Sequence, residues 1–201
     1  DYNTAVGAYA GDSILAGYSN TAVGDSALAG AATNDNTAVG KSALGAFTGS
    51  NATAVGAYAA DAAGSQTYLT AVGQGALGVA TSGNSNTAVG GLSLQTVDGA
   101  NNTAVGSAAL NADCEDDNTA VGRSALAAFT GSNATAVGAY AADAAGSQTN
   151  LTAVGHNALG AATSGDKNTA VGSACLGTIN GNDNTAVGYA ALSVDAGDSN
   201  T

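Results

Sequence analysis

The stretch Asn-Thr-Ala-Val-Gly-Lys-Ser-Ala-Leu-Gly-Ala-Phe-Thr-Gly-Ser-Asn, residues 36–51, is one copy of a unit that recurs along the whole chain. Its central string, Thr-Ala-Val-Gly, occurs twelve times, and the interval between successive copies is always either sixteen positions or seventeen. A fixed period this short indicates a solenoid, in which each repeat is one coil stacked on the last. We therefore expect residues 1–201 to be a single repeat array of about twelve coils, cut from a longer chain.

Each coil is predicted to open with a short β-strand. Side chains alternate along a strand, so Thr37 and Val39 share one face and Asn36 and Ala38 share the other. Because valine is more apolar than alanine, we expect Val39 and Thr37 to point inward, with the Asn and Ala ladders outward. Replacing Val121 with Asp would then bury an unpaired charge. The outward alanines, from Ala22 to Ala186, would let other copies of the chain approach closely.

After the strand, Gly40 is expected to turn the chain with a positive φ. A second short strand containing Leu44 should follow, and then a polar loop. The residue directly after the glycine varies freely and is therefore expected to be exposed. It is Asp25, Lys41, Gln74, Ser107, Arg123, His156 or Tyr189 in different coils.

Three coils lack the leucine and have a tyrosine two residues earlier. Gly11, Ala60 and Ala142 stand at the leucine position, and the tyrosines are Tyr9, Tyr58 and Tyr140. Two residues is the strand period, so each tyrosine would lie on the same face and fill the space of the missing leucine. The alternative is that these tyrosines are exposed and stack on sugars.

Composition excludes some classes of function. The net charge is −12, from 15 acidic residues against three Lys and Arg, and only 9% of residues are charged. Binding to nucleic acid needs clustered cations, so we expect no nucleic acid partner. No apolar run approaches the ~20 residues of a membrane span, so we expect no membrane insertion of this segment. So little charge also suggests that part of the surface is covered in an oligomer.

The sequence offers no constellation typical of a catalytic site, a cofactor site or a metal site. We therefore expect no enzyme activity, no cofactor and no metal, with the only histidine, His156, at an exposed position. Loop aspartates such as Asp35, Asp116 and Asp183 are interpreted as turn residues, with calcium ligands as the alternative. Cys114 and Cys175 lie four coils apart, roughly 19 Å at ~4.8 Å per coil, which is too far for a disulfide. They are read as packing residues, with a free thiol or an interchain link as the alternative for Cys114.

The sequence also contains a longer repeat, in which a segment recurs five coils later. Residues 36–73 recur as residues 118–155 with only three changes, which are Lys41 to Arg123, Gly45 to Ala127 and Tyr68 to Asn150. Such near-identity is typical of a shaft or a multivalent surface, because a unique active site is not built from duplicated surfaces.

The unit Asn-Thr-Ala-Val-Gly followed by x-x-Ala-Leu, as at residues 118–126, resembles the head repeats of trimeric autotransporter adhesins. Similar arrays occur in phage and viral tail fibres. The resemblance implies an all-β, left-handed parallel β-roll, three chains to a head, located outside a cell or on a virion. The coil here is two or three residues longer than the usual coil of that family.

Together these observations lead us to expect a non-enzymatic extracellular fibre or adhesin segment that attaches through a repetitive surface. Its partners would be further copies of the chain, as a trimer, and an unidentified receptor. The alternative is a purely structural filament of coils stacked head to tail. A lower alternative is an ice-binding solenoid, disfavoured because each strand offers one threonine beside a valine rather than two threonines.

Overall fold

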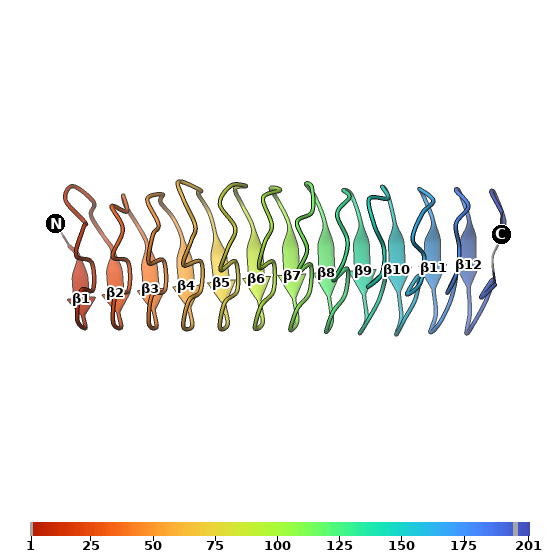
Figure 1. Ribbon diagram of the computed structural model, residues 1–201, viewed down its shortest axis with the longest axis horizontal. Coiled ribbons are helices and arrows are strands. Elements are labelled where there is room, and N and C mark those ends of the chain that lie inside the picture. The colour runs from red at the N-terminus through yellow and green to blue at the C-terminus, as the bar shows by residue number, and fades with distance from the viewer. Residues whose placement is uncertain (1, 195–196) are drawn as a thin grey trace. The chain divides into compact units, whose positions relative to one another are not determined.

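A computed structural model describes residues 2–194 and 197–201, and these residues form an all-β solenoid without helices (Figure 1). Every Thr-Ala-Val segment is a three-residue strand. The strands are β1 (Thr4–Val6), β2 (Thr21–Val23), β3 (Thr37–Val39), β4 (Thr53–Val55), β5 (Thr70–Val72), β6 (Thr87–Val89), β7 (Thr103–Val105), β8 (Thr119–Val121), β9 (Thr135–Val137), β10 (Thr152–Val154), β11 (Thr169–Val171) and β12 (Thr185–Val187). The predicted parallel β-solenoid of about twelve coils is confirmed.

The chain divides into two compact units, Asp1–Asn101 with β1 to β6 and Asn102–Thr201 with β7 to β12. Within each unit, neighbouring strands pair in parallel and in sequence order. Equivalent residues lie opposite each other, as with Thr37 and Thr53 in unit 1 and Thr119 and Thr135 in unit 2. The register is the same whether the coil is short, as from Thr21 to Thr37, or longer by one residue, as from Thr53 to Thr70. The additional residue is therefore accommodated in the loop.

The strands face the opposite way from the prediction. Ala38, Ala54, Ala120 and Ala136 have no exposed surface, whereas the valines of β2 to β11 are 36–39% exposed. The threonines lie on the same outer face as the valines and are partly or fully exposed. The prediction that Val39, Val121 and Thr37 point inward is wrong, and so is that of an outward alanine ladder.

The reason lies in the width of the coil. In the coil of β3, the fully buried side chains of Ala43, Leu44 and Phe47 fill the interior. Because a single short repeat closes the whole coil, the strand lies close to this turn and loop, and the inner strand position has room for a single methyl group. The volume of the side chain, and not its hydrophobicity, therefore decides which strand residue faces the interior.

The asparagine before the strand is also buried, where it links the coils. Asn36 is fully buried, and its Oδ1 accepts a hydrogen bond of 3.0 Å from the backbone N–H of Ala52 in the next coil. Its own backbone N–H donates to Oδ1 of Asn20 at 3.0 Å, and its Nδ2 donates to the Gly49 carbonyl at 3.3 Å. Asn118 makes the same contacts in unit 2 with Asn102, Ala134 and Gly131. The buried amide is thus fully paired, as a polar group in a core must be.

In the coils where a leucine replaces the asparagine, a glutamine from the preceding loop takes over part of its role. Leu69 occupies the asparagine position of its coil. Nε2 of the buried Gln66 donates to the carbonyls of Ala80 and Ser82 at 3.2 and 3.3 Å. Ser82 follows Leu69 at the same spacing that separates Asn36 from its acceptor Gly49. Gln148 occupies the corresponding place in unit 2 and donates to Ala162.

The turn glycine was predicted correctly. Gly40 has a φ of 131°, and a Cβ built there would lie 2.6 Å from the carbonyl oxygen of Gly56 in the next coil. The prediction of a second strand around Leu44 is wrong. Ser42 and Leu44 have φ values of 51° and 53°, so the segment is a series of left-handed turns. Its backbone still pairs between coils, with the Leu44 N–H donating to the Ala59 carbonyl at 2.9 Å.

The tyrosines do not replace the missing leucines. Tyr9 is 70% exposed, Tyr58 is 41% exposed and Tyr140 is half-buried. The prediction assumed strand alternation with one face exposed, but Ala59 and Ala60 are buried in succession, so buried and exposed residues do not alternate here. The positive φ angles of Tyr58 and Ala60 produce this departure. The tyrosines are therefore surface residues, as the alternative interpretation required.

The assignment of faces can be tested with two adjacent residues. We expect Ala120→Asp to bury an unpaired carboxylate and to cost several kcal/mol of unfolding free energy. Val121→Thr, on the outer face, should cost less than about 1 kcal/mol. Thermal melting followed by circular dichroism measures both. An equal loss in the two variants would contradict the assignment.

The asparagine ladder yields a second prediction. Asn118→Ala removes the acceptor of the Ala134 N–H and a donor to the Gly131 carbonyl, and it leaves both groups buried. Each unsatisfied group costs about 1–3 kcal/mol, so the variant should melt far below the parent protein. Thr130→Ala in the exposed loop of the same coil is the control, because its backbone bond to Gly146 remains. The ladder would be unimportant if both variants melted alike.

Candidate interaction surfaces

The Thr–Val face is the outer side of the strands, formed in each unit by the threonine and valine of every Thr-Ala-Val segment. In unit 1 the exposed valines are Val23, Val39, Val55, Val72 and Val89, and in unit 2 they are Val105, Val121, Val137, Val154 and Val171. None of the described strands contains a charged residue. In-register pairing places each threonine on a threonine and each valine on a valine. The result is a regular, half-apolar, uncharged surface, and large exposed patches of this kind mark interaction sites.

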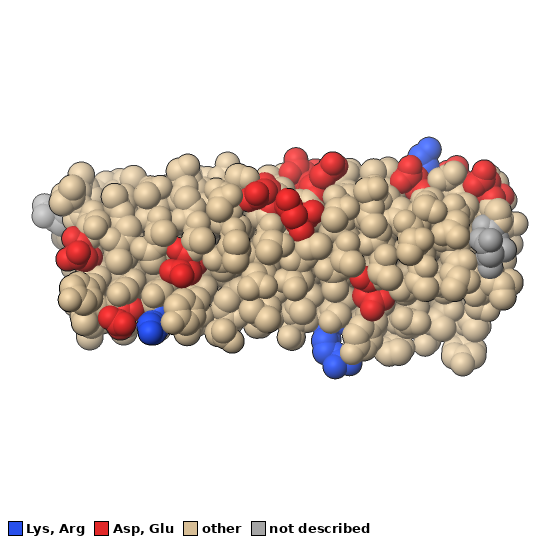
Figure 2. All heavy atoms as spheres, in the orientation of Figure 1, with Lys and Arg blue, Asp and Glu red and all other residues tan. Residues whose placement is uncertain are grey.

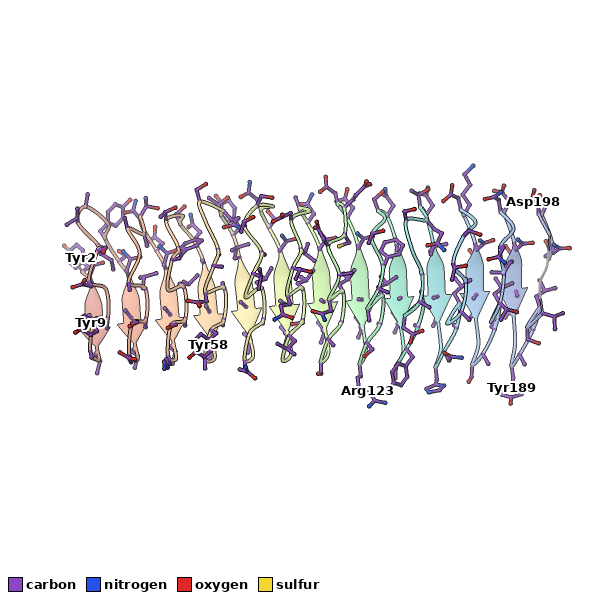
Figure 3. All side chains as sticks on the ribbon, viewed as in Figure 1. Tyr2, Tyr9, Tyr58, Arg123, Tyr189 and Asp198 are labelled. Carbon is purple, nitrogen blue, oxygen red and sulfur yellow. The ribbon has the colours of Figure 1, made fainter. Side chains whose placement is uncertain are left out.

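The turn edge is a second surface, formed by the two residues that follow the strand-ending glycine in each coil. Figure 3 shows Tyr9 and Tyr58 at this end of their coils in unit 1, and Arg123 and Tyr189 at the equivalent end in unit 2. Lys41, Arg123 and His156 are also exposed here, as predicted for the variable position. This edge holds two of the three cations of the chain.

Cations and aromatic rings contact each other between successive coils of the turn edge. In unit 1 the Lys41 Nζ lies 5.8 Å from the centre of the Tyr58 ring. In unit 2 the Arg123 guanidinium lies 4.5 Å from the centre of the Tyr140 ring, within the range of a cation–π interaction. The ring of His156 meets Tyr140 edge to face, with centroids 6.1 Å apart and an interplanar angle of 87°. The only histidine thus forms part of an aromatic and cationic cluster.

Sequence reasoning missed this cluster, although a signal for it was present. Tyr58 follows Lys41 by one coil plus one residue, and Tyr140 follows Arg123 by the same spacing. Such a spacing places each cation beside the tyrosine of the next coil. Aligning the coils, instead of examining each coil alone, would have revealed both pairs.

The loop edge, opposite the turns, carries most of the acidic residues. Figure 2 shows acidic groups mainly along the upper margin of unit 2, whereas in unit 1 they are spread over the visible face, and Figure 3 places Asp198 at the upper end of its coil. Several of the carboxylates accept backbone hydrogen bonds from the preceding coil. Asp166 accepts from the Thr149 N–H at 2.8 Å and Asp198 accepts from the Asn182 N–H at 2.7 Å. The carboxylates of Asp166 and Asp198 thus bond to the backbone of the preceding coil, which supports the interpretation of loop aspartates as structural residues of the turns.

Asp98 makes the same kind of contact with the preceding coil, and this contact lowers the pKa of its carboxyl group. Burial alone would raise the pKa of Asp98, but hydrogen bonds from the backbone and hydroxyl groups of Thr81 and Ser82 outweigh it and lower the pKa. The bonds from the Thr81 and Ser82 N–H groups are 2.9 Å each. The ionised carboxylate is therefore the form that holds the two coils together.

Asp35, Asp116 and Asp183 are all exposed in their loops. Among the residues the structure describes, no three His, Cys, Asp or Glu side chains converge as metal ligands would. The backbone N–H of Asp35 donates to the Tyr18 carbonyl, and that of Asp183 donates to the Asp166 carbonyl. Both residues have positive φ angles, so they occupy turn positions that aspartate tolerates.

Both cysteines are buried and free. Cys175 has no exposed surface, which confirms that it packs in place of an alanine. Burial also raises the pKa of the Cys114 thiol to about 12, so it stays protonated at neutral pH. A buried, protonated thiol is unreactive, which favours the packing interpretation of Cys114 over an interchain link.

Comparison with protein-family models, curated proteins and solved structures found no match to this chain. The described residues include no helix with the length and apolar character needed to cross a membrane. The candidate surfaces therefore rest on the geometry of the coils themselves.

The pKa of Asp98 predicts an acid-sensitive contact. Because the folded-state pKa is lowered, this carboxylate contributes stability above the pKa it has in the unfolded chain, about 3.9, and the contribution is lost as the pH falls through the folded value. Asp98→Asn keeps an acceptor oxygen but does not titrate. Unit 2 already has Asn180 at the equivalent place, where it accepts from the hydroxyls of Thr163 and Ser164.

We therefore expect the melting temperature of the parent protein to fall further between pH 5 and about pH 2 than that of Asp98→Asn. Differential scanning calorimetry across this range measures the difference. Parallel curves for the two proteins would show that ionised Asp98 does not stabilise the coil.

Proposed function

We propose that this chain is a non-enzymatic segment of an extracellular fibre or adhesin, in which copies of the chain associate through the Thr–Val face. The observation that carries the proposal is that the valines of that face are 36–39% exposed on an uncharged surface. Burying apolar surface contributes about 25 cal/mol per Å², and here no charge has to be removed from water at the same time. The repetition along the face lets a second copy make the same contact at every coil.

This arrangement replaces the packing through alanines that the sequence suggested. A face of threonine and valine suits a symmetric oligomer because valines of one copy can contact valines of another, while threonine hydroxyls pair at the margin. We propose a trimer, in keeping with the resemblance to adhesin heads, and a left-handed coil. The turn and loop edges stay outside such an interface and would be available for attachment to a cell or virion surface.

Attachment would be multivalent. A repeated coil presents equivalent groups at a constant spacing, so many weak contacts act together. The near-identical segments 36–73 and 118–155 present most groups once in each unit. We propose no catalytic role, no cofactor, no nucleic acid partner and no membrane insertion. A purely structural filament is the alternative, and in that case the edges would bind nothing.

The exposed threonines favour a second candidate function, which is binding to ice. Every strand has its threonine at least partly exposed, in register with the threonines of neighbouring coils, although each strand offers one threonine beside a valine rather than two. Such a surface can order water in a lattice. The two candidates compete for the same face, because a face buried between copies is not available to ice.

The proposed association can be tested by placing charged residues either on the Thr–Val face or in the exposed loops. Val121→Asp with Val154→Asp puts carboxylates on the Thr–Val face of unit 2, in β8 and β10, which do not pair with each other. The matched control, Ala128→Asp with Ala161→Asp, adds the same charge at exposed loop positions of the same coils. Sedimentation velocity should show an oligomer for the parent and the control, and a folded monomer for the valine variant.

A parent protein that stays monomeric at all concentrations would overturn the proposed association. If the monomer also depressed the freezing point without changing the melting point of ice, the second candidate would take its place. Loss of thermal hysteresis in the valine variant would then locate the ice-binding surface.

A further inference from the structure

We propose that the cluster of Arg123, Tyr140 and His156 on the turn edge of unit 2 binds acidic sugars, recognising a carboxylate on a saccharide. This inference rests on the proposed attachment function and names the ligand class for it. The proposal starts from an imbalance of charge. The chain carries 15 acidic and three basic residues, yet Arg123 forms no ion pair or side-chain hydrogen bond with any described residue.

In a chain with five times as many acidic as basic residues, an arginine would ordinarily pair with one of the acids. Arg123 instead lies over the ring of Tyr140 at 4.5 Å. A cation over an aromatic face is held in place but keeps its N–H groups, because the ring does not use them as hydrogen-bond donors. The planar guanidinium can therefore still bind a carboxylate with two parallel hydrogen bonds. The tyrosine positions the arginine and leaves its binding capacity intact.

The neighbouring coil extends the site. His156 contacts the edge of the Tyr140 ring from the coil that follows, so three successive coils contribute one side chain each. The Tyr140 hydroxyl and the imidazole can accept or donate hydrogen bonds, and the exposed margin of the ring offers apolar contact. A carboxylate beside hydroxyl groups and an apolar ring face is the chemistry of an acidic sugar.

The exposure of the cluster limits the strength of the site. Arg123 is exposed, so water and salt screen its contact with an anionic ligand. A single site should therefore bind weakly, and repetition of the site in an oligomer would supply the avidity.

Unit 1 contains a related arrangement that serves as an internal comparison. Lys41 lies 5.8 Å from the Tyr58 ring, and Gln74 stands where unit 2 has His156. Lysine offers a point charge without the planar fork, and Asp25 occupies the same position of the preceding coil. Unit 1 should therefore bind the same class of ligand more weakly than unit 2.

An acidic peptide is the competing partner class. A peptide of some length needs a groove or a free strand edge along which its backbone can lie. The turn edge offers exposed side chains on successive coils, which suits a compact sugar ring.

The test measures binding of immobilised sialyllactose, with neutral lactose and polyglutamate as comparison probes, by surface plasmon resonance of the assembled protein. We expect binding to sialyllactose and none to lactose. Arg123→Gln and Tyr140→Ala should each weaken it about tenfold, corresponding to ~1.4 kcal/mol. Arg123→Lys should retain part of the affinity.

Lys167→Gln is the matched control, because it removes the other cation of unit 2 from the loop edge and should leave binding unchanged. Polyglutamate binding as strong as sialyllactose binding would overturn the saccharide assignment, and so would equal loss in Lys167→Gln and Arg123→Gln. Failure to bind sialyllactose would overturn the inference itself.

Sedimentation velocity on the same samples separates this inference from the proposed association. Arg123→Gln should assemble as the parent does, since the turn edge lies outside the Thr–Val face. An assembled protein that binds no acidic sugar would leave the fibre in place and remove only its ligand. A protein that binds the acidic sugar but stays monomeric would support this inference and overturn the proposed association.

Discussion

The in-register stacking of coils is the constraint on which the rest of this structure depends. Within each unit, every strand residue lies on its equivalent in the next coil, as Ala38 lies on Ala54 and Val39 on Val55. Each position must therefore be compatible with a copy of itself one strand spacing away. Alanine, valine, threonine and asparagine meet this condition, because their contacts are apolar or are hydrogen bonds that continue from coil to coil. Repeated charge at one position does not, since like charges directly opposite repel each other.

The same stacking explains why strained backbone is tolerated at the turns. Leucine at a positive φ costs about 1–2 kcal/mol, yet Leu44 and its equivalents adopt this conformation in most coils. In return, Leu44 buries its side chain completely and donates its N–H to the next coil. Full burial of a leucine contributes about 1.5–3 kcal/mol, which offsets the strain. The turn is consequently part of the core as much as the strand is.

The period, the turn glycine and the exposed position after it could all be predicted from sequence, because each depends on local spacing or on one residue's backbone freedom. The orientation of the strand could not. Hydrophobicity ranks valine above alanine, but the larger Leu44 and Phe47 from the turn and loop fill the interior of the coil, and the strand contributes the small side chain of Ala38. The buried role of Asn36 was missed for a related reason, since its partners belong to other coils and are distant in sequence. The pairing of Arg123 with Tyr140 likewise appears only when the coils are placed side by side.

The strand register is indifferent to coil length, because Thr21 meets Thr37 and Thr53 meets Thr70 although the two intervals differ by one residue. Insertions and deletions in the loops therefore leave the strands, and the surface they form, undisturbed. Surface loops tolerate such changes, so the loop edge can be altered one coil at a time while the outer strand face stays constant.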